Sequence, residues 1–252
     1  MINWREKFIA TGIHFVVTAL LGAIAAAVIF LVWYPSPFHI MIGGAELFML
    51  VVGCDLALGP LLSLVVYNSR KSRQHLLIDY AVIGVLQIGA LLYGVMTTAD
   101  ARPVYIAFSH DRFEVVLAGQ LSDAELAEAS DPRYREVPWT GPRFVAVVVP
   151  PEERLDATLK AISGNEEHLR PRYYVPFESQ LENIRKRAKP LEDLERKKPA
   201  SQALLQEALK GAEVPSERLA WLPLRHPRGF WSAVVDETTG KPVAYIDLDP
   251  YD

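Results

Sequence analysis

Long apolar runs separated by short polar segments fill the first hundred residues, and shorter alternating stretches follow them. The apolar runs cover residues 8–34, about 43–67 and about 76–96. Each has the roughly 20 residues that a helix rising about 1.5 Å per residue needs to cross about 30 Å of hydrocarbon. The pattern therefore predicts a three-helix transmembrane anchor over residues 1–98 and a water-soluble domain over residues 99–252.

A cleavable signal peptide is the alternative reading of the first apolar run, because Arg5 and Lys7 precede it and small residues occupy positions 25–27. The run continues through Phe30 to Trp33, well beyond the roughly 7–15 residues of a signal-peptide core. Its length favours an uncleaved transmembrane helix.

Basic residues mark one side of the predicted anchor. Arg5 and Lys7 precede the first run, and Arg70, Lys71 and Arg73 lie in the 68–75 loop, whereas the 35–42 loop has no lysine or arginine. The positive-inside rule then puts the N-terminus and the 68–75 loop in the cytoplasm. Three crossings place residues 99–252 outside, which is the periplasm for a protein of a bacterial inner membrane.

Asp55 is the most unusual residue of the spans, because a charge near the middle of a transmembrane helix costs about 2.5–3.5 kcal/mol on insertion scales. Gly59 and Pro60 follow one turn later, and the proline predicts a kink. His14 in the first span and Gln87 in the third are the available polar partners. The acid is interpreted either as an intramembrane recognition or ion site or as part of a network that joins the helices.

Two further features of the spans concern packing and charge. The small residues Gly84, Gly89 and Ala90 in the third run, with residues 22–27 in the first, predict close helix packing. Asp79 lies near the start of the third helix, where a negative charge suits the helix dipole.

The soluble part shows the short β-branched and aromatic runs that are typical of strands. Two hairpins and one single strand are predicted at residues 103–108 with 113–118, 229–236 with 242–248, and 144–149. Helices are predicted at residues 121–130, 150–163 and 177–210, the last interrupted by Pro190 and Pro199. Strands at both ends with helices between them predict an α+β domain with an antiparallel sheet.

The charge balance differs between the two parts. Residues 1–98 carry five basic and four acidic side chains, and residues 99–252 carry 21 basic and 26 acidic ones. An acidic soluble domain argues against nucleic acid as a partner, because that partner needs a basic surface. The single cysteine, Cys54, excludes a disulfide within the chain and a multi-thiolate metal site. The mixed charges of residues 184–198 are interpreted as a solvated helical face.

The sequence contains no familiar catalytic motif. Residues 109–111 are Ser-His-Asp, but adjacent residues of one turn cannot converge as the members of a hydrolase triad do. Residues 166–168, Glu-Glu-His, lack the i, i+4 histidine pair of a helical zinc site, and His226 has no second ligand near it in sequence. We therefore expect no enzyme activity, no cofactor and no metal.

Four segments carry a further pattern: WYPSPF at residues 33–38, CDLALGPLLSLVVYNSRKS at 54–72, ARPVYIAF at 101–108 and WSAVVDETTGKPVAYIDLDP at 231–250. Together they resemble the TfpX/TfpZ family of type IV pilin accessory proteins. The resemblance covers the whole chain and is strongest over residues 33–118.

This resemblance implies a non-catalytic, chaperone-like membrane protein that binds a cognate major type IV pilin, through the pilin's transmembrane helix and with its globular head as a further contact. The protein would assist the stability of that pilin or its assembly into pili. The positions that match the family motif, as partner-binding or structural residues, are Trp33, Tyr34, Pro35, Asp55, Gly59, Pro60, Lys71, Asp79, Gln87, Tyr93, Gly94, Arg102 and Pro103.

Two other functions stay open at this point. A membrane-anchored sensory protein would bind a small ligand with its outer domain, but it would need a cytoplasmic signalling domain, and the predicted cytoplasmic parts are a short N-terminus and the 68–75 loop. A small membrane enzyme would need convergent polar residues, which the sequence does not reveal. The pilin accessory protein is the favoured function.

Overall fold

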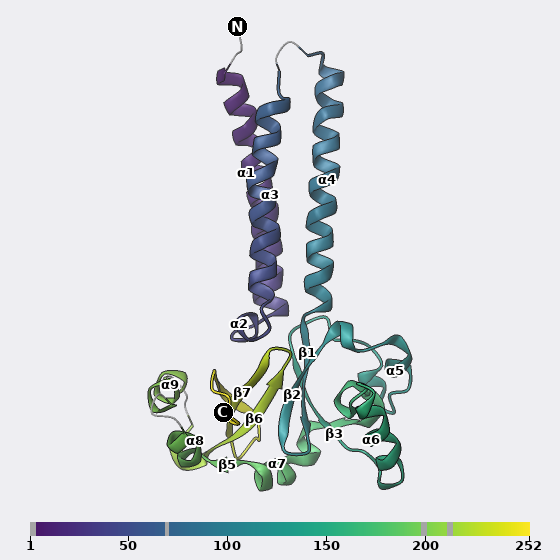
Figure 1. The fold of residues 1–252 in the computed structure, drawn as a ribbon, viewed down its shortest axis with the longest axis vertical. Coiled ribbons are helices and arrows are strands. Elements are labelled where there is room, and N and C mark those ends of the chain that lie inside the picture. The colour runs from purple at the N-terminus through teal and green to yellow at the C-terminus, as the bar shows by residue number, and fades with distance from the viewer. Residues whose placement is uncertain (1–3, 69–70, 198–200, 211–213) are drawn as a thin grey trace. The chain divides into compact units, whose positions relative to one another are not determined.

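The computed structural model describes residues 4–68, 71–197, 201–210 and 214–252, and the chain forms two compact units that divide between Ala101 and Arg102. Figure 1 shows long helices in the first unit and a sheet with short helices in the second. The described helices of the first unit are α1 Trp4–Val28, α2 Phe38–Ile42, α3 Gly44–Val66 and α4 Arg73–Asp100. A π-helix, Ile29–Trp33, continues α1.

The three predicted spans are confirmed as helices. Segments long and apolar enough to cross a membrane lie at Trp4–Trp33, Phe48–Val66 and Arg73–Asp100. The central helix α3 packs against both α1 and α4, and most apolar side chains on the outer faces of the three helices are exposed. Apolar surface of this extent is typical of helices that face lipid.

Two residues define the course of α3. Gly43 has a φ of 81°, a left-handed conformation that glycine adopts without a Cβ penalty, and it separates α2 from α3. Pro60 lies inside α3, which continues as a helix on both sides of it. The predicted kink at this proline stays a prediction.

Within the described residues, the second unit contains an eight-stranded sheet. Its order is β4-β3-β1-β2-β6-β7-β8, and β5 pairs with β6. The strands are β1 Pro103–Ser109, β2 Arg112–Leu117, β3 Arg143–Val147, β4 Tyr174–Pro176, β5 Lys189–Pro190, β6 Leu219–His226, β7 Gly229–Asp236 and β8 Pro242–Ile246. The helices are α5 Asp123–Ala127, α6 Arg154–Ile162, α7 Leu181–Arg187, α8 Leu191–Lys197 and α9 Ser201–Ala208.

The predicted α+β class is confirmed, and so are the hairpins β1–β2 and β7–β8. The sheet is mixed rather than antiparallel, because β1 pairs in parallel with β3 and β2 pairs in parallel with β6. A parallel pair joins strands that are far apart in sequence, so no local pattern indicates it.

Strands β4, β5 and β6 are missing from the sequence prediction, and β6 contains Pro223 in its middle, which is unusual for a central strand. The structure explains why the proline is tolerated. On one side of β6, Trp221 and Ala220 pair with β5, whereas Leu224 and Arg225 pair with β2. Pro223 lies where the neighbour changes, at a break in the ladder on that side.

The predicted helices are shorter than expected or divided. Helix α5 ends at Ala127, and Ser122 caps its start by accepting a hydrogen bond from the Glu125 N–H at 3.2 Å. The 177–210 stretch forms α7, α8 and α9, and Pro190 lies in β5 between the first two. Arg70, Lys198 and Pro199, which belong to the predicted cytoplasmic loop and the charged stretch, lie outside the described residues.

Two apolar clusters hold the second unit together. The first joins β1, β2 and β3 to α5 and includes Val104, Tyr105, Val116, Leu126 and Tyr174. The second joins α8 and α9 to β6, β7 and β8 and includes Leu194, Leu205, Trp221, Val234 and Ile246. Both are built from apolar contacts alone, so this domain needs no disulfide to bury a core.

Candidate functional site

A small cavity between the three long helices collects the polar residues of the spans. Its volume is about 140 Å³, and its lining is mainly apolar, with His14 and Thr18 of α1, Asp55 of α3 and Gln87 of α4 as polar members. His14, Asp55 and Gln87 are the three residues that the sequence singles out as possible intramembrane partners. The structure brings them to one place.

His14 and Gln87 make the main polar contact of this cavity, with His14 Nε2 at 2.7 Å from Gln87 Oε1. Gln87 Nε2 donates to the backbone carbonyl of Asp55 at 3.4 Å. An amide oxygen only accepts, so His14 donates from Nε2, and in a neutral imidazole Nδ1 is then an acceptor. Nδ1 is buried and has no partner among the described residues.

The Asp55 carboxylate adds two acceptor oxygens to this cavity, beside Nδ1 of His14. Asp55 is half-buried and lines the cavity. Within residues 4–68, 71–197, 201–210 and 214–252, no side chain forms an ion pair or hydrogen bond with its carboxylate. The contact between Asp55 and Gln87 uses the backbone, so the predicted network with His14 is only partly formed.

Glycines allow the helices to approach closely at two of the predicted positions. A Cβ at Gly59 would overlap Gln87 Nε2, and a Cβ at Gly94 would lie 2.7 Å from Cγ1 of Val51. In contrast, a Cβ at Gly84 or Gly89 would meet no atom within 4 Å. Within the described part of the chain, no other helix therefore packs closely on Gly84 or Gly89.

Trp33 and Tyr34 belong to an apolar cluster where α1 ends. The Tyr34 hydroxyl donates to the carbonyl of Thr98 at 2.8 Å, and its ring leaves no room for a Cβ at Gly44, which would lie 2.6 Å from Cε1. The Pro35 carbonyl accepts a hydrogen bond in the turn that leads into α2. These contacts give the three motif residues a structural role.

Lys71 and Asp79 form an ion pair of 2.7 Å between the loop after α3 and the first turns of α4. Lys71 also donates to the carbonyl of Val66 at 3.3 Å. Both charged side chains are about one third exposed, so the pair contributes about 1 kcal/mol or less. Tyr93, farther along α4, is 74% exposed.

The remaining two predicted positions lie in the second unit. Arg102 is buried, donates from Nη2 to the carbonyl of Pro138 at 3.3 Å, and has its guanidinium 5.7 Å from the centre of the Trp139 ring. Pro103 begins β1. Arg102 thus holds the 138–142 loop.

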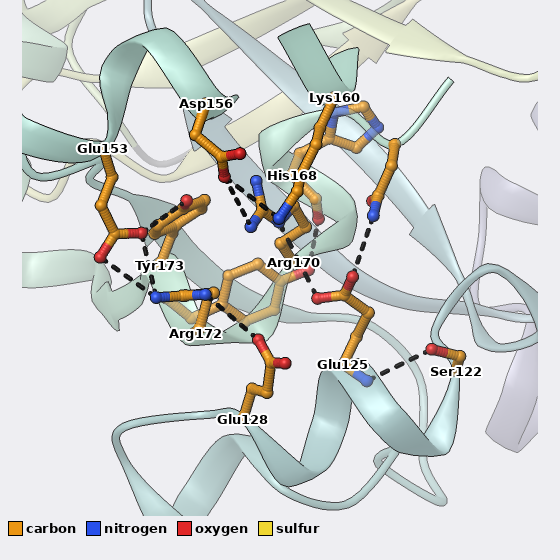
Figure 2. A network of polar contacts seen from close by, with 12 residues as sticks. Ser122, Glu125, Glu128, Glu153, Asp156, Lys160, His168, Arg170, Arg172 and Tyr173 are labelled. Atoms are coloured by element: carbon orange, nitrogen blue, oxygen red, sulfur yellow. Dashed lines mark hydrogen bonds and ion pairs between the residues drawn. The ribbon is translucent and has the colours of Figure 1, made fainter. Parts of the chain in front are cut away.

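Arg170 is the centre of a polar network in the second unit (Figure 2). Its side chain is 1% exposed, and its guanidinium lies 4.7 Å from the centre of the Tyr173 ring and 3.9 and 3.8 Å from the carboxylates of Glu125 and Asp156. Nε and Nη1 make no hydrogen bond with a described residue. The ring and the two carboxylates offset the cost of this buried charge, and the network ties α5 to α6.

One cavity of the second unit is lined by Glu114, Glu166, His168 and His226. The first three place atoms that can bind a metal within 4.8 Å of one another. Arg225 donates from Nε to Glu114 at 2.6 Å and from Nη2 to Glu166 at 2.5 Å. The guanidinium therefore supplies the positive charge that a metal ion would supply. Sequence reasoning misses this cluster, because Glu114 and Arg225 meet only through the register of β2 and β6.

The two most buried members of this cluster have shifted pKa values. Burial raises the pKa of Glu114 to about 7, although the hydrogen bond and charge of Arg225 lower it. Burial also lowers the pKa of His168 to about 4. Both shifts favour the neutral form of the side chain, as expected where desolvation is the largest effect.

A second cavity of the second unit, of about 460 Å³, lies between the ends of β1 and β3 and the helices α6 and α7. Arg154 and Arg187 line it, and their side chains make no hydrogen bond or ion pair with any described residue. Ser109 Oγ lies 3.0 Å from His110 Nδ1, and His110 Nε2 lies 3.4 Å from Glu167. Ser109 is 4% exposed, so this arrangement does not present a nucleophile at the surface.

Proteins similar to this chain cover nearly its whole length. A family model described as Fimbrial assembly protein FimB matches residues 2–43. The chain is 34% identical over 246 residues to a fimbrial assembly protein of serogroup I from Dichelobacter nodosus, which covers 96% of this chain and 95% of that protein. A serogroup E1 protein of the same organism is 33% identical over 246 residues, which again cover 96% of this chain and 95% of that protein. No solved structure matches the chain.

Proposed function

Because this chain belongs to the family of fimbrial assembly proteins, we propose that it is an inner-membrane accessory protein that binds a cognate type IV major pilin and assists its stability or its assembly into pili. The names of the relatives support a role in fimbrial assembly, not catalysis. They do not carry the narrower TfpX/TfpZ name, so the pilin as the bound partner belongs to the proposal.

One observation indicates that the helical unit binds a partner in addition to anchoring the chain. The three apolar helices surround a cavity in which the Asp55 carboxylate has no described partner. A carboxylate at membrane depth is costly, and one that does not stabilise its own helices is best explained by a partner that it binds. A pilin in the inner membrane presents a transmembrane helix to such a surface.

The proposed topology follows from the charges at the ends of the spans. Arg5 and Lys7 precede most of α1, and Lys71 and Arg73 lie between α3 and α4. The positive-inside rule puts these ends in the cytoplasm, so residues 99–252 form a periplasmic domain on an anchor of residues 1–98. The head of a pilin would then lie on the same side of the membrane as this domain.

Crosslinking in native membranes, followed by purification of the tagged full-length chain, tests the proposed partner. We expect the major pilin among the crosslinked proteins and fewer pili in a deletion strain. An unrelated tagged membrane protein with three spans controls for non-specific recovery. Normal piliation in the deletion strain, together with no recovered pilin, would refute the proposal.

Cysteine labelling tests the topology. With Cys54 replaced by serine, single cysteines at two exposed positions, Ser72→Cys and Ser163→Cys, serve as a matched pair. A membrane-impermeant maleimide should label the second in intact spheroplasts and the first only after lysis. Labelling of the first in intact spheroplasts would reverse the orientation.

A periplasmic domain that binds a small anionic ligand is the second candidate, and the 460 Å³ cavity with Arg154 and Arg187 is the observation that favours it. Calorimetric titration of the full chain in detergent with inorganic phosphate and with citrate tests it. Binding that disappears in the double variant Arg154→Gln, Arg187→Gln, but not in Lys186→Gln on the same helix, would support this function. No binding of either anion would argue against it.

A further inference from the structure

The cavity at Asp55 is part of a longer groove whose walls are α1 and α4. A second cavity, of about 390 Å³, adjoins it, and the two share His14, Val17 and Gly84 as lining residues. Helix α3 supplies Val52 and Asp55 to the lining of the first cavity. We call the two cavities together the α1–α4 groove.

Gly84 leaves this groove open on the side of α4. A Cβ at Gly84 would meet nothing within 4 Å, whereas Gly59 and Gly94 have neighbouring side chains pressed against them. Small residues at a helix surface allow a second helix to approach closely. Gly12, Gly53 and Gly89 also meet no atom within 4 Å, but of these four glycines only Gly84 lines the groove.

Two acceptors in the groove lack a hydrogen-bond partner among the described residues, beside the hydroxyl groups of Thr18, Tyr67 and Tyr80, which also line it. Both ends of the Gln87 amide are engaged, Oε1 by His14 and Nε2 by the Asp55 carbonyl. His14 Nδ1 and the Asp55 carboxylate remain as acceptors without a described partner. An occupant that satisfies them must carry a cationic group or an N–H or O–H donor.

From this geometry we propose that the α1–α4 groove binds the transmembrane helix of a partner protein, which places one cationic or hydrogen-bond-donating group between Asp55 and His14. This inference rests on the proposed function, because it locates the binding site of the partner named there. The cavity at Asp55, of about 140 Å³, is close to the roughly 150 Å³ that accommodates a benzene ring in an engineered apolar cavity. It has room for one large side chain.

Two other occupants fit the chemistry less well. A lipid acyl chain has no donor for Asp55 or His14. A second copy of this chain could offer Asp55 a histidine or a hydroxyl donor but no lysine or arginine, because the basic residues of the first 98 positions are at 5, 7, 70, 71 and 73. Charge complementarity thus favours a different protein.

Site-specific photocrosslinking in native membranes tests the groove. A benzophenone amino acid at Val17, inside the groove, should crosslink to the pilin, and one at Val85, which is 71% exposed and outside the lining, should not. Gly84→Leu fills the groove and should lower the crosslink from Val17 by about tenfold or more, because overpacking excludes the partner helix. The matched control Gly89→Leu, on the same helix and also facing open space, should leave it within about twofold.

The charge is tested by Asp55→Asn, which keeps the shape and removes the carboxylate, and which should lower the crosslink by about tenfold. If the full chain still recovers pilin while Val17 crosslinks only lipid or a second copy, the groove is wrong and the proposed function stands. If Gly84→Leu and Gly89→Leu retain the crosslink equally, the α1–α4 groove is not the binding site of the partner helix. If no variant and no wild-type chain recovers pilin, the proposed function itself falls.

Discussion

Replacing His168 by glutamine should make the second unit more stable as the pH falls from 6.5 to about 4.5, whereas the wild-type chain should change much less over this range. The reason is that two neighbouring buried groups, Glu114 and His168, respond to protons in opposite ways. Removing one of them should uncover the effect of the other.

The size and sign of each effect follow from the shifted pKa values. Burial raises the pKa of Glu114 from 4.5 to about 7, so between these values the folded chain holds a proton that the unfolded chain has lost. Its contribution to the free energy of unfolding therefore rises as the pH falls, by about 1.4 kcal/mol per pH unit and by about 3 kcal/mol in all.

His168 has the opposite slope. Burial lowers its pKa from 6.5 to about 4, so the unfolded chain takes up a proton over a range in which the folded chain does not. Stability is then lost as the pH falls, again by about 3 kcal/mol over the whole window. The two windows overlap between pH 4.5 and 6.5, and there the two slopes cancel.

Urea denaturation of the full chain in a mild detergent, followed by tryptophan fluorescence, measures these slopes. The free energy of each variant is compared with wild type at every pH, so that the other titrating groups cancel. From pH 6.5 to 4.5, His168→Gln should gain about 2–3 kcal/mol relative to wild type, and Glu114→Gln should lose about as much. Glu217→Gln, at an exposed carboxylate, is the control for the chemical change. The reasoning would be refuted if the free energy of unfolding of each variant differed from that of wild type by the same amount at pH 6.5 and at pH 4.5.

Four substitutions in the helical unit test its contacts, with thermal unfolding in detergent followed by circular dichroism. Gly94→Ala should cost about 1–3 kcal/mol, because its Cβ overlaps a valine of α3, while Gly89→Ala, which meets open space, should cost little. Tyr34→Phe should cost about 1 kcal/mol through its buried hydrogen bond. Lys71→Gln should cost less, because its ion pair with Asp79 is partly exposed. Equal losses from the two glycine variants, or a larger loss from Lys71→Gln than from Tyr34→Phe, would contradict these assignments.

The sequence was sufficient for the spans, because a bilayer imposes a length and an apolar composition that can be counted along the chain. It also singled out His14, Asp55 and Gln87, since few polar residues occur in the spans. Which glycines pack against a neighbour depends on how each helix is rotated about its axis. No local pattern distinguishes Gly94 from Gly89 in this respect.

In the second unit, predictability followed the distance along the chain between partners. The hairpins β1–β2 and β7–β8 were predicted because a short turn joins the two strands of each. The ion pair of Glu114 and Arg225 joins residues 111 positions apart and exists only because β2 and β6 lie in parallel register. The pH response argued above therefore depends on a contact that only the fold reveals.

A motif residue of the anchor can stabilise the helix bundle or bind a partner, and variants of Gly94 and Asp55 distinguish these two roles. Gly94 is packed against α3, so Gly94→Ala should lower bundle stability and pilin recovery together. Asp55 has no described partner for its carboxylate, and an uncompensated charge at this depth costs about 2.5–3.5 kcal/mol. Asp55→Asn should therefore leave the bundle as stable as before or make it more stable, and still reduce pilin recovery. Parallel measurement of unfolding temperature and pilin crosslinking in both variants decides the matter. If Asp55→Asn loses stability and recovery in the same proportion as Gly94→Ala, the carboxylate supports the bundle and does not bind a partner.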